Sequence, residues 1–176
     1  ATGTGTFLAE VIRQIHEKFK GQEGIWSNYV ENHLIPRLNG FEILMASYAM
    51  AHLKLDLLLT ETGYKPTTNQ RFRVYLTNSL EEHHQDTGTL FANWLSTEAN
   101  EANHIKRDTP VMCVIGNPPY IRQEELKSWK EYFKIRYEVY AGTADLLVYF
   151  FELSFQIMKN DGYLCMITSN KFIKAN

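Results

Sequence analysis

The sequence predicts one α/β domain, in which a parallel β-sheet is covered by helices on both faces. Three observations support this fold class. Short β-rich runs alternate with helical segments along the chain, and 176 residues are enough for one sizeable core. Hydrophobic residues make up 44% and charged residues 22%, a globular composition that excludes a disordered chain, a collagen-like repeat and a disulfide scaffold.

The first half of the chain is predicted to contain three helices and two strands. We expect the helices at residues 6–20, 27–34 and 43–59, and the strands at 37–42 and 72–76. Gly21 and Gly24 are predicted to end the first helix, and Pro36 to stop the second. The third helix is apolar on most faces, which indicates burial, and its Lys54 and Asp56 argue against a membrane span.

The second half is predicted to contain three helices and two buried strands. We expect helices at 89–103, 123–137 and 145–158, the last closed by Gly162, and strands at 111–115 and 163–167. The apolar run 111–115 is typical of a strand buried on both faces. Cys113 and Cys165 lie in these two runs, so we expect reduced, buried thiols of a cytosolic protein.

Charge and histidine patterns carry little functional signal. The net charge of −2 gives no strongly basic footprint. Residues 122–136 hold five basic side chains against three acidic ones, so either a contact to a phosphate backbone or a solvated helix face fits this segment. His83, His84 and His104 match no common zinc spacing, and we predict no metal site.

Polar or glycine-rich motifs occur where ligands bind in such sheets, next to the carboxyl ends of the strands. Gly3 and Gly5 precede the first helix, which Thr4 or Thr6 could cap; this is either a ligand-binding loop or an ordinary one. Glu42 follows a strand and suits two ribose hydroxyls, or else is a carboxylate at a helix start.

Two asparagines also follow predicted strands. Asn78 could read a purine edge with one donor and one acceptor, although an isolated Asn is more often a turn residue. Asn117 begins the strongest motif, residues 117–120. Pro118 and Pro119 stiffen the backbone and leave their carbonyls as acceptors, and Tyr120 offers a flat face for stacking. This set suits a planar amine, whereas the alternative is a rigid turn at a strand exit.

These motifs resemble those of adenine-specific DNA methyltransferases. Residues 117–120 are the Asn-Pro-Pro-Tyr motif of that family, and residues 1–7 resemble the end of its methyl-donor motif. Further likeness lies in Phe41-Glu42 with 48–52, in 76–80 and in 145–172, so that it covers nearly the whole chain. The sequence of these segments is similar to the methylase core of enzymes that combine restriction and modification in one chain.

The resemblance implies a Rossmann-like S-adenosylmethionine-dependent methyltransferase sheet, with S-adenosylmethionine as the donor. It implies that Thr2, Gly3 and Gly5 line the methionine end of the donor, Glu42 its ribose and Asn78 its adenine ring.

The resemblance also implies an acceptor site for adenine in double-stranded DNA. Asn117 and the Pro118 carbonyl would hold the target amine, Pro119 would keep the loop rigid, and Tyr120 would stack on the flipped base. The reaction implied is transfer of a methyl group to the N6 amine, within a cytoplasmic restriction–modification system. No metal and no membrane are expected to take part.

Several family features do not occur in this sequence. They are the Asp-Pro pair, the strand that feeds the glycine loop, a target-recognition region and a nuclease motif. We therefore expect residues 1–176 to be a partial catalytic domain, inactive by itself and able to self-associate through open strand edges. Two alternatives stay open: a protein-glutamine or RNA methyltransferase of the same fold, and a non-catalytic DNA-docking or structural domain.

Overall fold

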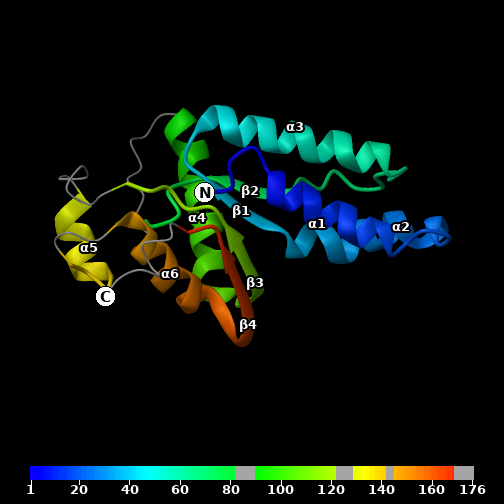
Figure 1. The fold of residues 1–176 in the computed structure, drawn as a ribbon. Coiled ribbons are helices and arrows are strands. Elements are labelled where there is room, and N and C mark those ends of the chain that lie inside the picture. The colour runs from blue at the N-terminus through cyan, green and yellow to red at the C-terminus, as the bar shows by residue number, and fades with distance from the viewer. Residues whose placement is uncertain (82–89, 122–128, 142–144, 169–176) are drawn as a thin grey trace. The chain divides into compact units, whose positions relative to one another are not determined.

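The computed structural model describes residues 1–81, 90–121, 129–141 and 145–168. The chain divides into two compact units, Ala1–Ala102 and Asn103–Asn176, here called the N-terminal and C-terminal units. Figure 1 shows the helices and strands of both units. Among the described residues, no helix combines the length and the apolar character needed to cross a membrane.

The N-terminal unit contains a parallel pair of strands, β1 (Asn39–Glu42) and β2 (Arg73–Leu76). Its helices are α1 (Thr6–Glu17), α2 (Glu23–Tyr29), the π-helix η1 (Val30–Leu34), the 3-10 helix η2 (Ile35–Arg37), α3 (Met45–Glu61) and the first part of α4 (Leu90–Asp108). Asn39 lies opposite Arg73, and Glu42 opposite Leu76. Both strands therefore end at the same edge of the sheet.

Helices α1 and α3 run along this strand pair and enclose the main core with it (Figure 1). The residues of this core are Ala9, Ile12, Trp26, Val30, Leu34, Ile35, Ala51, Leu55, Leu58, Leu59, Phe72 and Val74. The helical spacing of Ala51, Leu55, Leu58 and Leu59 gives α3 one continuous buried face. This core fixes β1 and β2, and with them the loops that leave their carboxyl ends.

The C-terminal unit contains the parallel pair β3 (Val111–Gly116) and β4 (Met158–Met166), with α5 (Lys130–Arg136) and α6 (Leu146–Ile157). Cys113 lies opposite Tyr163, and Gly116 opposite Met166. Phe133 of α5 stacks on Tyr149 of α6, with ring centroids 4.6 Å apart, so aromatic contacts join the two helices.

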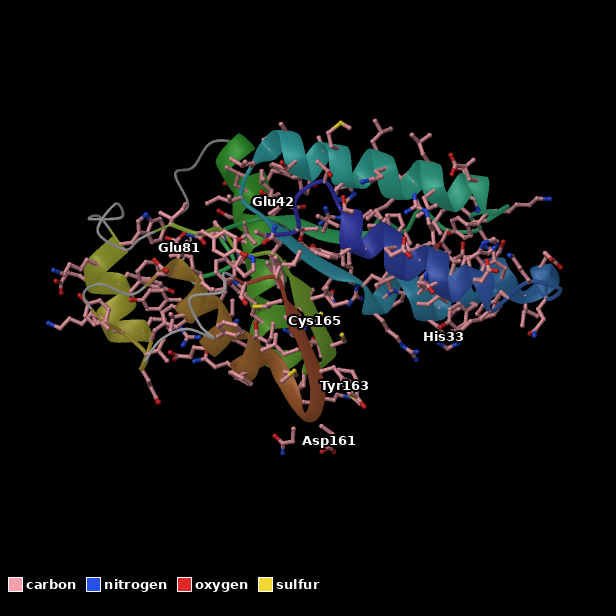
Figure 2. The ribbon with its side chains drawn as sticks, in the orientation of Figure 1. His33, Glu42, Glu81, Asp161, Tyr163 and Cys165 are labelled. Atoms are coloured by element: carbon pink, nitrogen blue, oxygen red, sulfur yellow. The ribbon has the colours of Figure 1, made fainter. Side chains whose placement is uncertain are left out.

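The predicted burial of the strand at 111–115 is wrong, and so is the prediction of buried thiols. Met112 and Ile115 are 52% and 42% exposed, and Cys113 and Cys165 are both exposed, free thiols; Figure 2 labels Cys165 on β4. A sheet of two strands presents too narrow a surface for helices to enclose both faces. The apolar pattern of a strand indicates what it can bury, not how many neighbours it has.

The parallel pairing is confirmed, but the described strands form two separate pairs rather than one sheet. Gly24 lies inside α2 instead of ending α1. Pro36 lies within the 3-10 helix η2, near its start, where the N–H that proline lacks has no partner within the helix. Gly162 does not close α6, because α6 ends at Ile157 and Gly162 lies within β4. There a Cβ atom would come 2.3 Å from Met158 Cγ, at the irregularity in strand register.

Two sequence predictions lie partly outside the described residues. Helix α5 is the described end of the helix predicted at 123–137, while residues 122–128 are not described. His83 and His84 also lie outside the described residues.

Candidate functional site

The glycine loop of residues 2–5 lies against the edge of β1 that faces away from β2. The Thr2 N–H and Oγ1–H both donate to the Phe41 carbonyl, at 2.9 and 3.0 Å. The Gly5 N–H donates back to the Thr2 carbonyl at 3.2 Å and closes the loop. Gly40 makes this approach possible, since a Cβ atom there would lie 2.7 Å from Thr2 Oγ1. The loop thus begins as a short backbone extension of the sheet.

Glu42 ties this loop to the end of β1 (Figure 2). Its side chain is buried, with 4% of the residue exposed. Oε2 accepts the Gly3 N–H at 2.6 Å, and Oε1 accepts the N–H groups of Ile43 and Leu44 at 3.0 and 2.9 Å. A carboxylate has about four acceptor positions, so Oε2 can still accept from a ligand hydroxyl. Glu42 therefore organises both the glycine loop and the turn that leads into α3.

The glycines of the loop adopt the left-handed backbone conformation. Gly3 and Gly5 have φ angles of +59° and +74°, and a Cβ atom at Gly5 would lie 3.2 Å from Ala51 Cβ. The predicted cap by Thr4 or Thr6 is wrong: Gly5 is the N-cap of α1, and no side chain caps it. The Thr6 hydroxyl instead accepts from Lys54 Nζ at 3.0 Å. The first N–H groups of α1 are thereby left to bind a negative group.

Asn78 forms the turn that follows β2. Its Oδ1 accepts the Leu80 N–H at 3.1 Å, and its carbonyl accepts the Glu81 N–H at 3.3 Å. In the described part of the chain no group engages Nδ2, and Oδ1 has a second acceptor position beside the Leu80 N–H, so the amide can offer a ligand both a donor and an acceptor. The Ala1 amine donates to Ser79 Oγ at 3.4 Å, which links the glycine loop to this turn. The loop, Glu42 and the Asn78 turn thus meet at the carboxyl ends of β1 and β2.

The Asn-Pro-Pro-Tyr motif follows β3 directly in the C-terminal unit. The Tyr120 hydroxyl donates to the Ile167 carbonyl at 2.8 Å, and lies 3.4 Å from Asn117 Oδ1. Ile167 is itself fixed, because its N–H donates to the Gly116 carbonyl at 3.0 Å. Pro118 is buried, whereas Asn117 and Tyr120 are exposed. The motif is a braced loop that presents one amide and one aromatic ring to solvent.

The predicted site residues therefore form two groups, one in each unit. Three residues that sequence reasoning missed support them: Gly40, Ser79 and Ile167. A glycine inside a strand signals close backbone approach, so Gly40 could have been found from the sequence. Ser79 and Ile167 act through one hydroxyl and one carbonyl, and no local pattern signals either.

Metal ligands do not cluster among the described residues. Within residues 1–81, 90–121, 129–141 and 145–168, no three His, Cys, Asp or Glu side chains are placed to hold one ion. The groups at the site are hydrogen-bond donors and acceptors, suited to binding and orienting polar organic ligands.

The chain is similar to a protein family and to individual known proteins. A family model described as Eco57I restriction-modification methylase matches residues 38–176, which include β1, β2 and the Asn-Pro-Pro-Tyr motif. The chain is also 27% identical over 175 residues to the Type II methyltransferase M.BstVI of Geobacillus stearothermophilus. That match covers 98% of this chain, and the chain spans 28% of the length of that relative.

Proposed function

We propose that this chain, which belongs to the Eco57I restriction-modification methylase family, supplies the donor and acceptor sites of an adenine-specific DNA methyltransferase. The methyl donor is S-adenosylmethionine, and the acceptor is the N6 amine of an adenine flipped out of double-stranded DNA. The observation that carries the proposal is the braced Asn117–Tyr120 loop at the carboxyl end of β3, in a chain of this family.

The N-terminal unit supplies the donor site. Thr2, Gly3 and Gly5 form a loop without bulky side chains, and α1 begins directly after it with uncapped N–H groups. These groups suit the carboxylate of the methionine moiety. Glu42 Oε2 accepts from a ribose hydroxyl, and Asn78 Nδ2 donates to a ring nitrogen of the donor adenine. Asn78 Oδ1 holds the Leu80 N–H in one of its two acceptor positions, and the other suits the amino group of that adenine.

The C-terminal unit supplies the acceptor site. Asn117 Oδ1 and the Pro118 carbonyl accept the two hydrogens of the target amine, and the Tyr120 ring stacks on the base. The amine is a poor nucleophile, because its lone pair is delocalised into the adenine ring. Two acceptors favour a pyramidal nitrogen, whose lone pair then points at the methyl group. In the reaction the sulfur–methyl bond breaks as the nitrogen–methyl bond forms, and the nitrogen afterwards loses one proton to solvent.

Positioning is the main contribution of these residues to the rate. Extruding the base costs a few kcal/mol, which stacking on Tyr120 and the hydrogen bonds to Asn117 and Pro118 offset. The contact between Tyr120 and Asn117, at 3.4 Å, is long enough to yield when the amine arrives.

The test is a methyl-transfer assay on the complete gene product. Donor carrying a tritiated methyl group is incubated with duplex DNA, with RNA and with protein acceptors, and the labelled DNA is digested to nucleosides for chromatography. We expect label in duplex DNA, recovered as N6-methyl-2′-deoxyadenosine. Label in cytosine would refute adenine specificity. Label in RNA or protein would instead indicate a methyltransferase of the same fold that acts on that substrate. Failure to bind the donor would indicate a docking or structural domain.

A further inference from the structure

The outer edge of β2 is closed by side chains. On this edge the Val74 carbonyl lies 3.1 Å from His52 Nε2 of α3, and the Leu76 N–H donates to Glu98 Oε2 of α4 at 3.1 Å. The opposite edge pairs with β1, where the Thr77 N–H donates to the Glu42 carbonyl at 2.8 Å. The last residues of β2 are thus held from both sides, immediately before the turn at Asn78.

Glu98 is the buried charge of this arrangement. The residue is 2% exposed, and its Oε1 forms an ion pair with the Arg71 guanidinium at 2.6 Å. Arg71 also contacts Glu101 at 3.1 Å, and its guanidinium lies 5.5 Å from the centre of the Tyr75 ring. Burying a carboxylate is costly unless it is paired and hydrogen-bonded, and Glu98 is both. Its two oxygens join α4 to the last residue of β2 and to Arg71, two residues before the strand begins.

We propose that Glu98 is a positioning residue for the donor adenine, an inference that rests on the proposed function. Its carboxylate holds the Leu76 N–H, two residues before Asn78, and so sets where the Asn78 amide lies. Glu98 does not touch the donor. The Leu76 N–H points away from β1, so without Glu98 this buried donor group loses its partner and the strand end can shift.

A double-mutant cycle on the complete gene product tests this role. Glu98→Gln keeps the side-chain shape but has only one acceptor oxygen, so its NH2 group must face one of two donors, Arg71 or the Leu76 N–H. Glu98→Asp keeps the charge but shortens the reach to Leu76, so it serves where Glu98→Gln does not fold. Each is combined with Asn78→Ala, and S-adenosylmethionine affinity is measured by calorimetric titration. The matched control is Glu101→Gln, which changes the exposed partner of the same arginine one turn along α4.

We expect Glu98→Gln or Glu98→Asp to weaken donor binding about tenfold, with kcat at saturating donor unchanged. In the Asn78→Ala background the same changes should lower donor affinity little further, because the contact between Asn78 and the donor adenine is already absent. Glu101→Gln should bind the donor normally.

Three results would overturn the inference: an unchanged affinity in both Glu98 variants, effects that add fully to that of Asn78→Ala, or an Asn78→Ala variant that binds normally. Failure of the unsubstituted protein to bind the donor would instead refute the proposed function, on which the inference depends.

Discussion

At the scale of single residues, Glu42 organises both the turn that leads into α3 and the glycine loop. Its Oε1 holds the two N–H groups that precede α3, as a carboxylate at a helix start does. Its Oε2 holds the Gly3 N–H, which brings the glycine loop to the end of β1. One buried side chain thus sets the shape of the proposed donor site and keeps an acceptor position for the ligand.

Glu42→Ala should therefore weaken S-adenosylmethionine binding by at least tenfold in the complete gene product. A charge-assisted hydrogen bond to a ribose hydroxyl is worth about 1.5–3 kcal/mol, and the loop loses its anchor as well. Calorimetric titration measures the affinity. The control is Glu31→Ala, which removes a carboxylate that organises a different loop through the Thr67 and Thr68 N–H groups. Equal affinities in the Glu42 variant and the unsubstituted protein would reduce Glu42 to a helix-start residue.

Asn117→Ala should have the opposite profile. The Asn117 amide is proposed to contact the target amine and not the donor, so kcat should fall about a hundredfold or more while donor affinity stays constant. Methyl transfer to duplex DNA and donor titration are measured on the same preparation. Tyr120→Phe is the comparison variant, because it keeps the stacking ring and the Asn117 amide and loses the hydroxyl, with its bond to Ile167 and its long contact with Asn117. A fully active Asn117→Ala enzyme would exclude a catalytic role.

At the scale of elements, the sequence predicts what is locally encoded. The amphipathic spacing of α1, the long apolar run of α3 and the β-rich runs of β1 and β2 give their positions to within a few residues. The exits of β1, β2 and β3 also carry the expected site residues. The exposure of β3 was not predictable, because the local sequence of a strand does not determine how many other strands lie beside it. Glu98 was missed for a similar reason: its partners Arg71 and Leu76 lie more than 20 residues away.

Gly40→Ala tests how the glycine loop depends on β1. The added Cβ atom would lie 2.7 Å from Thr2 Oγ1 and 3.0 Å from Thr2 Cγ2, so the loop must move away from the strand. We expect a destabilisation of about 1 kcal/mol or more and a several-fold loss of donor affinity. Gly24→Ala is the control: it lies in α2 with open space around it, and alanine there should stabilise the helix. Normal donor binding by Gly40→Ala would show that the loop does not need its place on β1.

The contact between the loop at 64–68 and η1 predicts a pH dependence. Burial, and then the charge of Glu31, raise the pKa of Tyr64 to about 12. The pKa of an unfolded tyrosine is about 10, so the native state favours the protonated hydroxyl. This contribution to stability is complete below about pH 10 and is lost as the pH rises through about 12.

Thermal melts of the unsubstituted chain and of Tyr64→Phe between pH 9 and about pH 12 measure this effect. The difference in Tm between the two proteins should shrink as the pH rises, because only one of them loses a proton at residue 64. Glu31→Gln should lower the pKa of Tyr64, as followed by tyrosinate absorbance. A Tm difference that is independent of pH would show that the hydroxyl bond to Glu31 does not form.

At the scale of the whole molecule, the two units differ in how they bury apolar surface. The main core lies entirely in the N-terminal unit, where α1 and α3 enclose one face of a strand pair. In the C-terminal unit, α5 and α6 pack through aromatic rings, while β3 and β4 carry exposed apolar side chains such as Met112 and Tyr163. A pair of strands without a buried face is marginally stable in water. The pair of β3 and β4, of which β3 leads into the Asn-Pro-Pro-Tyr motif, is therefore the weaker of the two strand pairs.

Hydrogen exchange on the 176-residue chain should reveal this difference in stability. Local opening requires less free energy where few apolar contacts are broken. We expect the amides of α1 and α3 to exchange slowest and those of β3 and β4 to exchange orders of magnitude faster, as followed by mass spectrometry of peptic peptides. Peptides from β1 and β2 provide the internal control, because they come from a parallel pair of similar size that packs on a core. The Asn117–Tyr120 loop follows β3 directly. Fast exchange of the β3 amides would therefore mean that this loop is ordered only when β3 and β4 are stabilised. Equal protection of the amides in the two strand pairs would contradict the expected difference in stability between them.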